Sequence, residues 1–225
     1  MLLQIIRKNY QYKMKKIETL AEYQQLASRT CPDLGSLKLN AFHMNSGVKT
    51  EVGEAIDPIK KFIAYGKPLD IVNVGEEMGD ICWYIANKAR MFLSAEVLDR
   101  SWHTQESFNK YSIDFEKTFS KDLENFENEK VKMIAVANLI SSIDSNDADI
   151  DSFSEKSSVG VPSLIIINKC CELLNLDFWQ ILTNNIEKLQ IRYPEKFTEE
   201  AALNRDLEAE REALEKTGSD DTAEN

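Results

Sequence analysis

The amino-acid sequence predicts an all-α protein, a helical bundle in a single domain. Helix breakers are scarce, since the 225 residues include only five prolines and eight glycines. Long stretches are rich in Glu, Lys, Leu, Ile and Ala, a composition typical of helices. In two segments, residues 48–65 and 70–93, apolar side chains recur every three or four positions, which is the spacing of one helix face. A hydrophobic content of 43% is enough to build the core of one such domain.

The N-terminal third should hold three helices, separated by glycine and proline signals. We expect the first helix from residue 1 to about residue 29, with a break over residues 29–35. A short helix should follow over residues 36–45. Gly47 should then mark a turn into the first regular helix, residues 48–65.

The middle of the chain changes character after the second regular helix. Residues 66–68 (GKP) should separate the two regular helices, and the second should run over residues 70–93. In residues 94–160, aromatic side chains alternate with Lys, Asp and Glu. Within this region we expect a helix over residues 131–143 and an exposed loop over residues 141–158, which is rich in Ser, Asp and Asn. We interpret the region as a largely helical insertion into the core fold.

The helical core should resume at Pro162, a residue favoured in the first turn of a helix. A break at residues 175–177 should lead into a helix over residues 178–191, which residues 193–194 (YP) should end. A charged surface helix should follow over residues 198–216. The expected parts are one domain over 1–216, with its core at about 20–93 and 162–210 and its insertion at about 94–160, and a disordered tail over 217–225.

Two short acidic motifs with the same layout lie in the two regular helices: EVGE at residues 51–54 and EMGD at residues 77–80. Each motif places two carboxylates three residues apart, and at about 100° per residue these share one helix face. Two such helices packed together would bring four carboxylates close to one another. Four carboxylates repel unless a cation lies among them, and oxygen ligands suit Mg²⁺ or Mn²⁺ rather than Zn²⁺. The candidate metal ligands are Glu51, Glu54, Glu77 and Asp80.

A glycine precedes the second acid of each motif. A glycine inside a helix is less favourable than alanine by about 1 kcal/mol, so the repetition suggests a shared requirement. We expect Gly53 and Gly79 to let the two backbones approach closely where the acids converge. The alternative is that the motifs are solvated acidic faces, since 29% of the residues are charged.

The composition also excludes several classes of function. A net charge of −11 argues against binding to a nucleic acid polymer, although a bound metal would still permit nucleotide binding. The four cysteines form no CxxC pair and only two histidines are present, which argues against a structural zinc site. No signal peptide or membrane-spanning segment is visible, so we expect a cytoplasmic protein that does not bind membranes.

Three segments together resemble one protein family. They are residues 47–54 (GVKTEVGE), residues 76–84 (EEMGDICWY), and residues 185–194 (NIEKLQIRYP) followed by Phe197. They are similar to the patterns GLxxExGE, EELGDxxWY and NxxKLxxRYPxxF of the MazG-like all-α nucleoside triphosphate pyrophosphohydrolases, and of the phage-encoded members in particular. Residues 28–30 (SRT) and residues 204–206 (NRD) also fit those relatives.

The resemblance covers about residues 20–93 and 162–210. The insertion departs from it, because relatives usually join these two blocks by a few residues, and this leaves the outer wall of the substrate pocket undefined. The resemblance implies a helical bundle of the all-α NTP pyrophosphatase type. It also implies hydrolysis of a (deoxy)nucleoside triphosphate between the α and β phosphates, which gives a nucleoside monophosphate and pyrophosphate. The same resemblance implies a requirement for Mg²⁺, with Mn²⁺ as a substitute. It also implies assembly into a homodimer or homotetramer.

The acids of the two motifs fit that chemistry. A triphosphate carries about four negative charges, so its binding beside four carboxylates requires a divalent metal. The acids would hold the metal, and one of them would also take the proton of the attacking water. Glu51 and Glu54 are both candidates for this catalytic role.

Other polar side chains near the motifs are candidates for substrate binding. The lysines and the arginine would contact phosphate oxygens, although lysines on a helix face can equally be only solvated. The asparagine would hydrogen-bond the base, sugar or phosphate, and the tyrosine would contact the nucleotide or pack in the core. The candidates are Lys60, Lys61, Tyr84, Asn185, Lys188 and Arg192. We interpret Trp83 as a core residue, and His43 and His103 as packing or surface residues.

Two alternatives belong to other functional classes. The chain could be a non-catalytic helical protein that binds a partner through the insertion at residues 94–160. It could also be a carboxylate-bridged di-iron bundle, but that site would need Glu-x-x-His pairs, and neither histidine lies in one.

Overall fold

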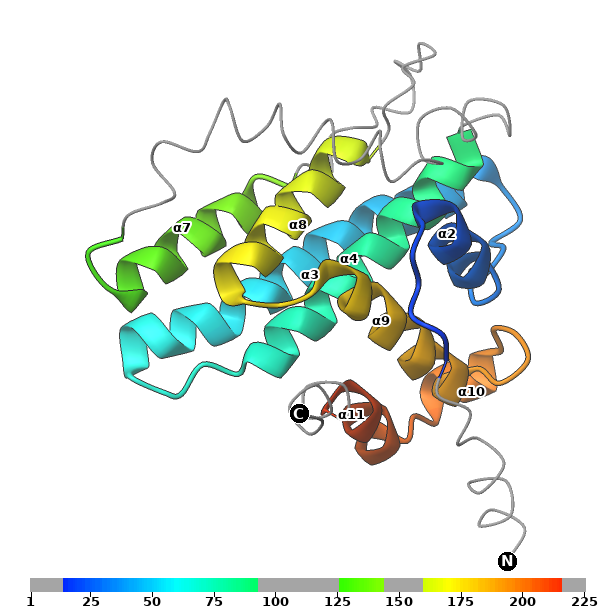
Figure 1. Cartoon of the computed structure of the whole chain (residues 1–225). Coiled ribbons are helices and arrows are strands. Elements are labelled where there is room, and N and C mark those ends of the chain that lie inside the picture. Colours follow the sequence, from blue (N-terminus) through cyan, green and yellow to red (C-terminus); the bar gives the residue numbers. More distant parts are fainter. Residues whose placement is uncertain (1–13, 93–125, 144–159, 216–225) are drawn as a thin grey trace, which may run out of the picture.

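The computed structural model describes residues 14–92, 126–143 and 160–215, and these form helices and connecting segments only (Figure 1). The predicted all-α class is confirmed. In the described part, no helix is both long and apolar enough to cross a membrane. The helices are α2 (Leu20–Ser28), α3 (Leu37–Tyr65), α4 (Ile71–Phe92), α7 (Glu129–Ser141), α8 (Val161–Leu174), α9 (Phe178–Arg192), α10 (Glu199–Leu203) and α11 (Leu207–Glu215).

The antiparallel pair α3 and α4 forms the centre of the bundle (Figure 1). Gly66 ends α3 in the left-handed conformation, with φ of 65°, and its N–H donates to the carbonyl of Lys61. Asp70 begins α4, because its Oδ1 accepts a hydrogen bond from the Asn73 N–H at 3.0 Å. The short connection makes the two helices neighbours and places residues 51–54 beside residues 77–80.

The turn predicted at Gly47 is wrong, because α3 continues through it as one helix from Leu37 to Tyr65. Ser36 begins this helix, with its Oγ accepting from the Leu39 N–H at 3.3 Å. A Cβ at position 47 would overlap the ring of Tyr84 on α4. Gly47 therefore permits the close approach of a neighbouring side chain, and it does not interrupt the helix.

The predicted helix over residues 1–29 begins only at Leu20 within the described part of the chain. Residues 14–19 lie along α9 instead, where the Ile17 N–H donates to Thr183 Oγ1 at 3.0 Å. Thr19 then begins α2 by accepting a hydrogen bond from the Glu22 N–H at 3.2 Å. The sequence pattern missed this start because Thr183 is supplied by a distant part of the chain.

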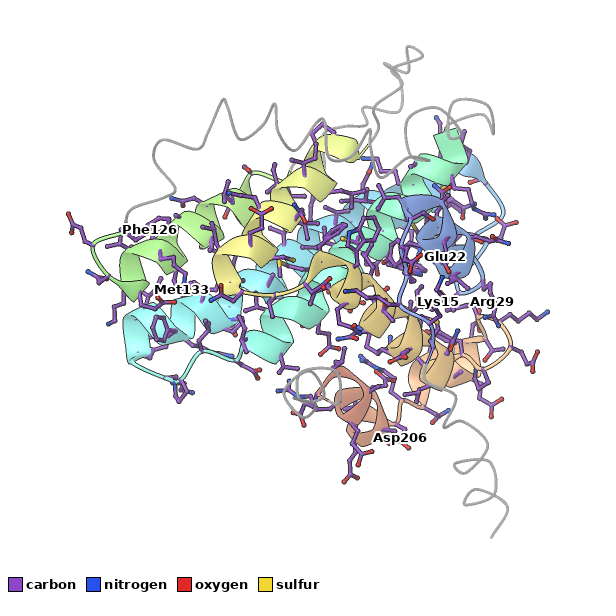
Figure 2. The ribbon with its side chains drawn as sticks, in the orientation of Figure 1. Lys15, Glu22, Arg29, Phe126, Met133 and Asp206 are labelled. Carbon is purple, nitrogen blue, oxygen red and sulfur yellow. The ribbon has the colours of Figure 1, made fainter. Side chains whose placement is uncertain are left out.

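Helix α7 belongs to the core, although it lies within the predicted insertion. The predicted helix over residues 131–143 is present at Glu129–Ser141. Its side chains Met133, Val136 and Ile140 are fully buried in the same core as α3 and α8. Figure 2 shows side chains filling the space between these helices. The rest of the insertion, residues 94–125 and 144–159, and the tail at 217–225 lie outside the described residues.

The C-terminal helices follow the prediction up to residue 194. Helix α8 has Pro162 in its first turn, and Asp177 begins α9 by accepting from the Gln180 N–H at 3.0 Å. The single surface helix predicted over residues 198–216 is wrong, since α10 and α11 are separate there. Helix α11 packs against α9, and its Glu210 and Leu214 are buried, so this segment is part of the fold.

Candidate functional site

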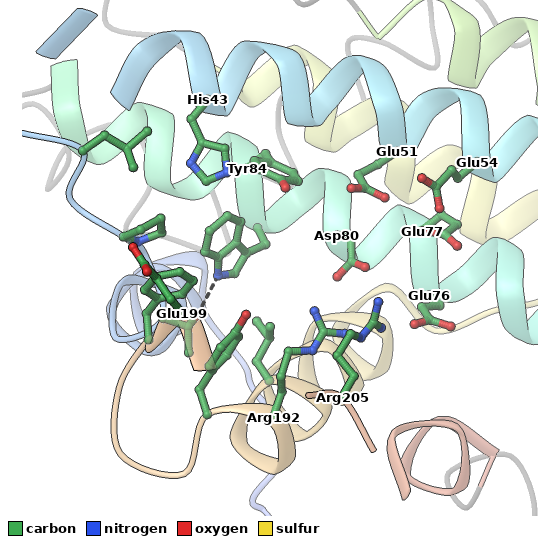
Figure 3. Close-up of a pocket in the computed structure, with 17 residues that line it drawn as sticks. His43, Glu51, Glu54, Glu76, Glu77, Asp80, Tyr84, Arg192, Glu199 and Arg205 are labelled. Atoms are coloured by element: carbon green, nitrogen blue, oxygen red, sulfur yellow. Dashed lines mark hydrogen bonds between the residues drawn. The ribbon is translucent and has the colours of Figure 1, made fainter. Parts of the chain in front are cut away.

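A cavity of about 480 Å³ opens between the α3–α4 pair and the segment that runs from α9 to the start of α11 (Figure 3). This volume falls in the range of about 300–1,000 Å³ that small-molecule sites occupy. Its wall has three chemically different parts: carboxylates from α3 and α4, two arginines on the opposite side, and a group of aromatic side chains.

The carboxylate wall brings together three of the four predicted metal ligands. Glu51 on α3 and Glu77 and Asp80 on α4 each have a carboxylate oxygen within 4.8 Å of the other two. Glu54 lines the same wall but lies outside this group, beside Glu77 in Figure 3. Glu76 also lines the cavity and was not predicted as a site residue.

Burial and crowding make the ionised form of this cluster unfavourable. Burial, followed by the negative charge of Asp80, raises the pKa values of Glu51 and Glu77 above their usual range. Glu77 also accepts a hydrogen bond from Asn73 Nδ2 at 2.8 Å, which fixes its direction. Three converging oxygen donors that repel one another match the requirements of a hard divalent cation such as Mg²⁺ or Mn²⁺.

Asp80 is held in place by two residues of α9 that we predicted to bind substrate. Asn185 Nδ2 donates to Asp80 Oδ1 at 2.6 Å, and the Tyr23 hydroxyl donates to Asn185 Oδ1 at 2.9 Å. Lys188 Nζ donates to Asp80 Oδ2 at 2.5 Å and to Glu76 Oε1 at 3.2 Å. Because Asn185 and Lys188 are both buried, the geometry makes them positioning residues for the carboxylates.

The close approach of α3 and α4 that we expected at the two motif glycines occurs at neither of them. A Cβ on Gly79 would lie 3.1 Å from Asn185 Cβ, so α4 approaches α9 there and not α3. A Cβ on Gly53 would meet nothing within 4 Å, so the prediction is wrong at both glycines. The contact between α3 and α4 depends instead on Gly47 and the ring of Tyr84.

The structure does not bring Lys60 and Lys61 to the cavity. Both are exposed, and both pair with Asp57 on their own helix. Lys61 shares a helix face with Glu54, but seven residues of helix displace it by about 10 Å along the axis. That distance carries it past the end of the cavity wall.

The arginine wall is organised by a carboxylate of α11. Arg192 donates from Nε to Glu210 Oε1 at 3.0 Å and from Nη2 to Glu210 Oε2 at 2.5 Å. Arg205 Nη2 donates to the same Oε2 at 2.8 Å. Glu210 is only 2% exposed. Burial by itself would raise the pKa of its carboxyl, but the two guanidinium groups hold that pKa below its usual range.

Sequence reasoning identified Arg192 but missed Arg205 and Glu210. A signal for Arg205 was present, because residues 204–206 match the relatives that the chain resembles. Glu210 carried no such signal, since an acid in a highly charged helix looks like a solvated surface residue.

Aromatic side chains form the third part of the wall. The ring of Tyr84 packs edge-on against His43, with ring centres 5.6 Å apart, and against Trp83 at 4.9 Å. Trp83 is buried in the core as predicted, and its Nε1 donates to Thr30 Oγ1 at 2.9 Å, but it also lines the cavity. Tyr193 and Phe197 complete this part of the wall. His43 was interpreted as a packing residue but also lines the cavity, and His103 lies outside the described residues.

The arrangement suits an elongated anion that carries an aromatic group. A divalent cation among the carboxylates and the arginines opposite would contact the anion from two sides, and the aromatic part would accommodate a planar ring. Comparison of the chain with protein-family models, curated proteins and solved structures gave no match. The resemblance to the MazG-like family therefore rests on the sequence motifs alone.

Proposed function

We propose that the chain is a metal-dependent nucleoside triphosphate pyrophosphohydrolase, which releases a nucleoside monophosphate and pyrophosphate. One observation carries the proposal. The carboxylates of Glu51, Glu77 and Asp80, with oxygens within 4.8 Å of one another, line a cavity of about 480 Å³. The motif resemblance to MazG-like enzymes supports the same reaction and the cleavage between the α and β phosphates.

Glu51, Glu77 and Asp80 would hold Mg²⁺ or Mn²⁺, with Glu54 close by on the same wall. A bound divalent cation would screen the phosphate charge and make an adjacent water more acidic. Asn185 and Lys188 orient Asp80 before any ligand arrives, so the site is pre-organised on this side.

The remaining walls would hold the two ends of the substrate. Arg192 and Arg205 offer guanidinium groups to phosphate oxygens, which are their preferred partners. Tyr84 and its aromatic neighbours offer flat surfaces for the base. Either Glu51 or Glu54 would accept the proton of the attacking water, and Glu51 is the one within the carboxylate group.

A panel of ribo- and deoxyribonucleoside triphosphates tests this function. The full chain is incubated with each nucleotide in Mg²⁺, in Mn²⁺ and in a chelator, and the products are separated by anion exchange. We expect a monophosphate and pyrophosphate as products, and only when metal is present. Glu77→Gln should abolish their formation, whereas the exposed control Lys60→Gln should not. Diphosphate and orthophosphate would contradict the bond assignment. No product under any condition would favour the partner-binding alternative.

The resemblance also implies a homodimer or homotetramer, and we propose such an assembly. Exposed apolar side chains at the start of α3 support it, since Leu37 and Phe42 are 53% and 67% exposed. Sedimentation equilibrium of the full chain should give a mass of two or four subunits. A single-subunit mass at working concentration would contradict the proposal.

A further inference from the structure

Two arginines that line the cavity share one buried carboxylate. Arg192 comes from the end of α9, and Arg205 comes from the segment between α10 and α11. Both donate to Glu210, which lies in α11. Figure 3 shows the two guanidinium groups on the side of the cavity opposite Asp80 and Glu76. Three separate segments thus place two fixed positive charges across from the acids.

The cluster keeps a net positive charge, since one carboxylate faces two guanidinium groups. A guanidinium has five N–H donors, and Glu210 accepts two from Arg192 and one from Arg205. Within the described residues, Glu210 is the only carboxylate that pairs with either arginine. Among the described residues, no second hydrogen-bond acceptor pairs with either arginine, and both side chains line the cavity, where an anion can reach them.

We infer that Arg192 and Arg205, positioned by Glu210, bind the pyrophosphate part of the substrate. This inference rests on the proposed function. A ligand that bridges the two walls needs several charged oxygens on opposite sides, which a polyphosphate has and a single carboxylate lacks. The arginine pair faces the carboxylates, so it receives the phosphates that a cation at Glu51, Glu77 and Asp80 leaves accessible.

This placement gives the arginines a role in the reaction. The oxygen of a water forms a bond to the α-phosphorus, and a carboxylate of the cavity takes the water's proton. The bond between the α-phosphorus and the bridging oxygen breaks, and its electron pair leaves on the pyrophosphate. Negative charge therefore grows on the departing group, where fixed guanidinium groups stabilise it.

Binding of inorganic pyrophosphate to the full chain in Mg²⁺, measured by calorimetry, tests the inference. Arg205→Gln should weaken this binding by about tenfold or more, the loss of a charge-assisted contact. Arg211→Gln is a matched control on α11, because its side chain is 38% exposed against 39% for Arg205. Arg211 pairs with Asp70 and Glu215 and does not line the cavity, so its replacement should leave the affinity unchanged.

Glu210 is tested as a positioning residue by its coupling to Arg205. Glu210→Gln should weaken pyrophosphate binding in the normal chain, and less so in a chain that already carries Arg205→Gln, where only Arg192 remains for Glu210 to position. A merely structural role would give the same loss in both backgrounds. Melting temperatures show whether each variant folds. If Glu210→Gln does not fold, the pyrophosphate affinity of Arg205→Gln alone tests the inference, because the Arg205 side chain is 39% exposed.

The outcomes separate the inference from the proposed function. If nucleoside triphosphates are hydrolysed but Arg205→Gln binds pyrophosphate and turns over like the unaltered chain, the inference is wrong and the function stands. If no nucleotide is hydrolysed but pyrophosphate binds in an Arg205-dependent manner, the function is wrong and the anion site stands. Absence of pyrophosphate binding to the unaltered chain also overturns the inference.

Discussion

Lys188 Nζ lies 2.5 Å from Asp80 Oδ2, and the Lys188 side chain is only 1% exposed. The same nitrogen donates to Glu76 Oε1 at 3.2 Å. Although burial favours the neutral amine, the charges of Asp80 and Glu76 raise the pKa of Lys188. The carboxylate wall therefore contains its own buried positive charge, and the effects of removing it can be measured.

Replacing Lys188 should destabilise the metal-free protein strongly. Lys188→Met keeps the apolar stem but leaves two carboxylates without their partner, and breaking a buried pair in this way costs about 3–5 kcal/mol. Part of the loss should return in Mg²⁺, because a cation would replace the missing charge. Urea unfolding with chelator and with Mg²⁺ measures both effects. The exposed variant Lys60→Met should show no measurable change, and an equal loss in both variants would refute this account.

Replacing Asn185 should have a larger effect on metal affinity than on the stability of the fold. Asn185→Ala removes the hydrogen bond that orients Asp80, and the loss of such supporting contacts typically lowers metal affinity by about 10- to 100-fold. Calorimetric titration with Mn²⁺ measures the affinity. Asn168→Ala is the control, since Asn168 bonds Glu172 on α8, away from the cavity. Unchanged Mn²⁺ affinity in Asn185→Ala would show that Asp80 does not need this support.

The stability of the metal-free protein should fall as pH rises from mildly acidic to alkaline values. The pKa values of Glu51 and Glu77 are raised by burial and by Asp80, above their ordinary value of 4.5. Between that value and the raised ones, the folded state binds more protons than the unfolded state, so the free energy of unfolding decreases with pH. Melting temperatures in chelator between pH 5 and pH 9 should show this loss.

The pH effect can be assigned to the carboxylates by substitution and by metal. Glu51→Gln should reduce the loss, because one of the groups that must ionise is gone. Mg²⁺ should also reduce it, since a cation favours the ionised forms. A melting temperature that rises across this range in chelator and is insensitive to Glu51→Gln would contradict the assignment.

Two glycines of α3 should respond oppositely to alanine. In Gly47→Ala, the new Cβ overlaps the ring of Tyr84, which is packed edge-on against His43 and Trp83. Such overpacking costs about 1–3 kcal/mol. Gly53→Ala meets nothing within 4 Å, so it should stabilise the helix by about 0.5–1 kcal/mol. Chemical denaturation of both variants measures these changes in the free energy of unfolding. Stabilisation by Gly47→Ala would contradict the prediction, because it would mean that the Tyr84 ring moves aside at no cost.

Much of the fold could be predicted because its signals are local. The glycine that ends α3, Gly66, and the acid that begins α9, Asp177, are capping residues that act within one turn of the chain. Gly47 shows where local signals fail. A glycine that interrupts a helix and one that accommodates a ring from another helix look identical in sequence, and only the position of Tyr84 distinguishes them.

In the candidate site, too, the local features could be predicted from the sequence and the contacts between distant segments could not. The spacing of the EVGE and EMGD motifs was enough to place each pair of acids on one face of its own helix, because helical periodicity is a local property. The packing of α3 against α4 decided that Glu51, Glu77 and Asp80 converge and that Glu54 lies outside their group. Sequence could not show that Lys188 would be buried against Asp80, or that Glu210 would join Arg192 to Arg205. Those contacts join side chains from separate segments of the chain. They were decided by the packing of α9 against α4 and α11, which no local pattern encodes.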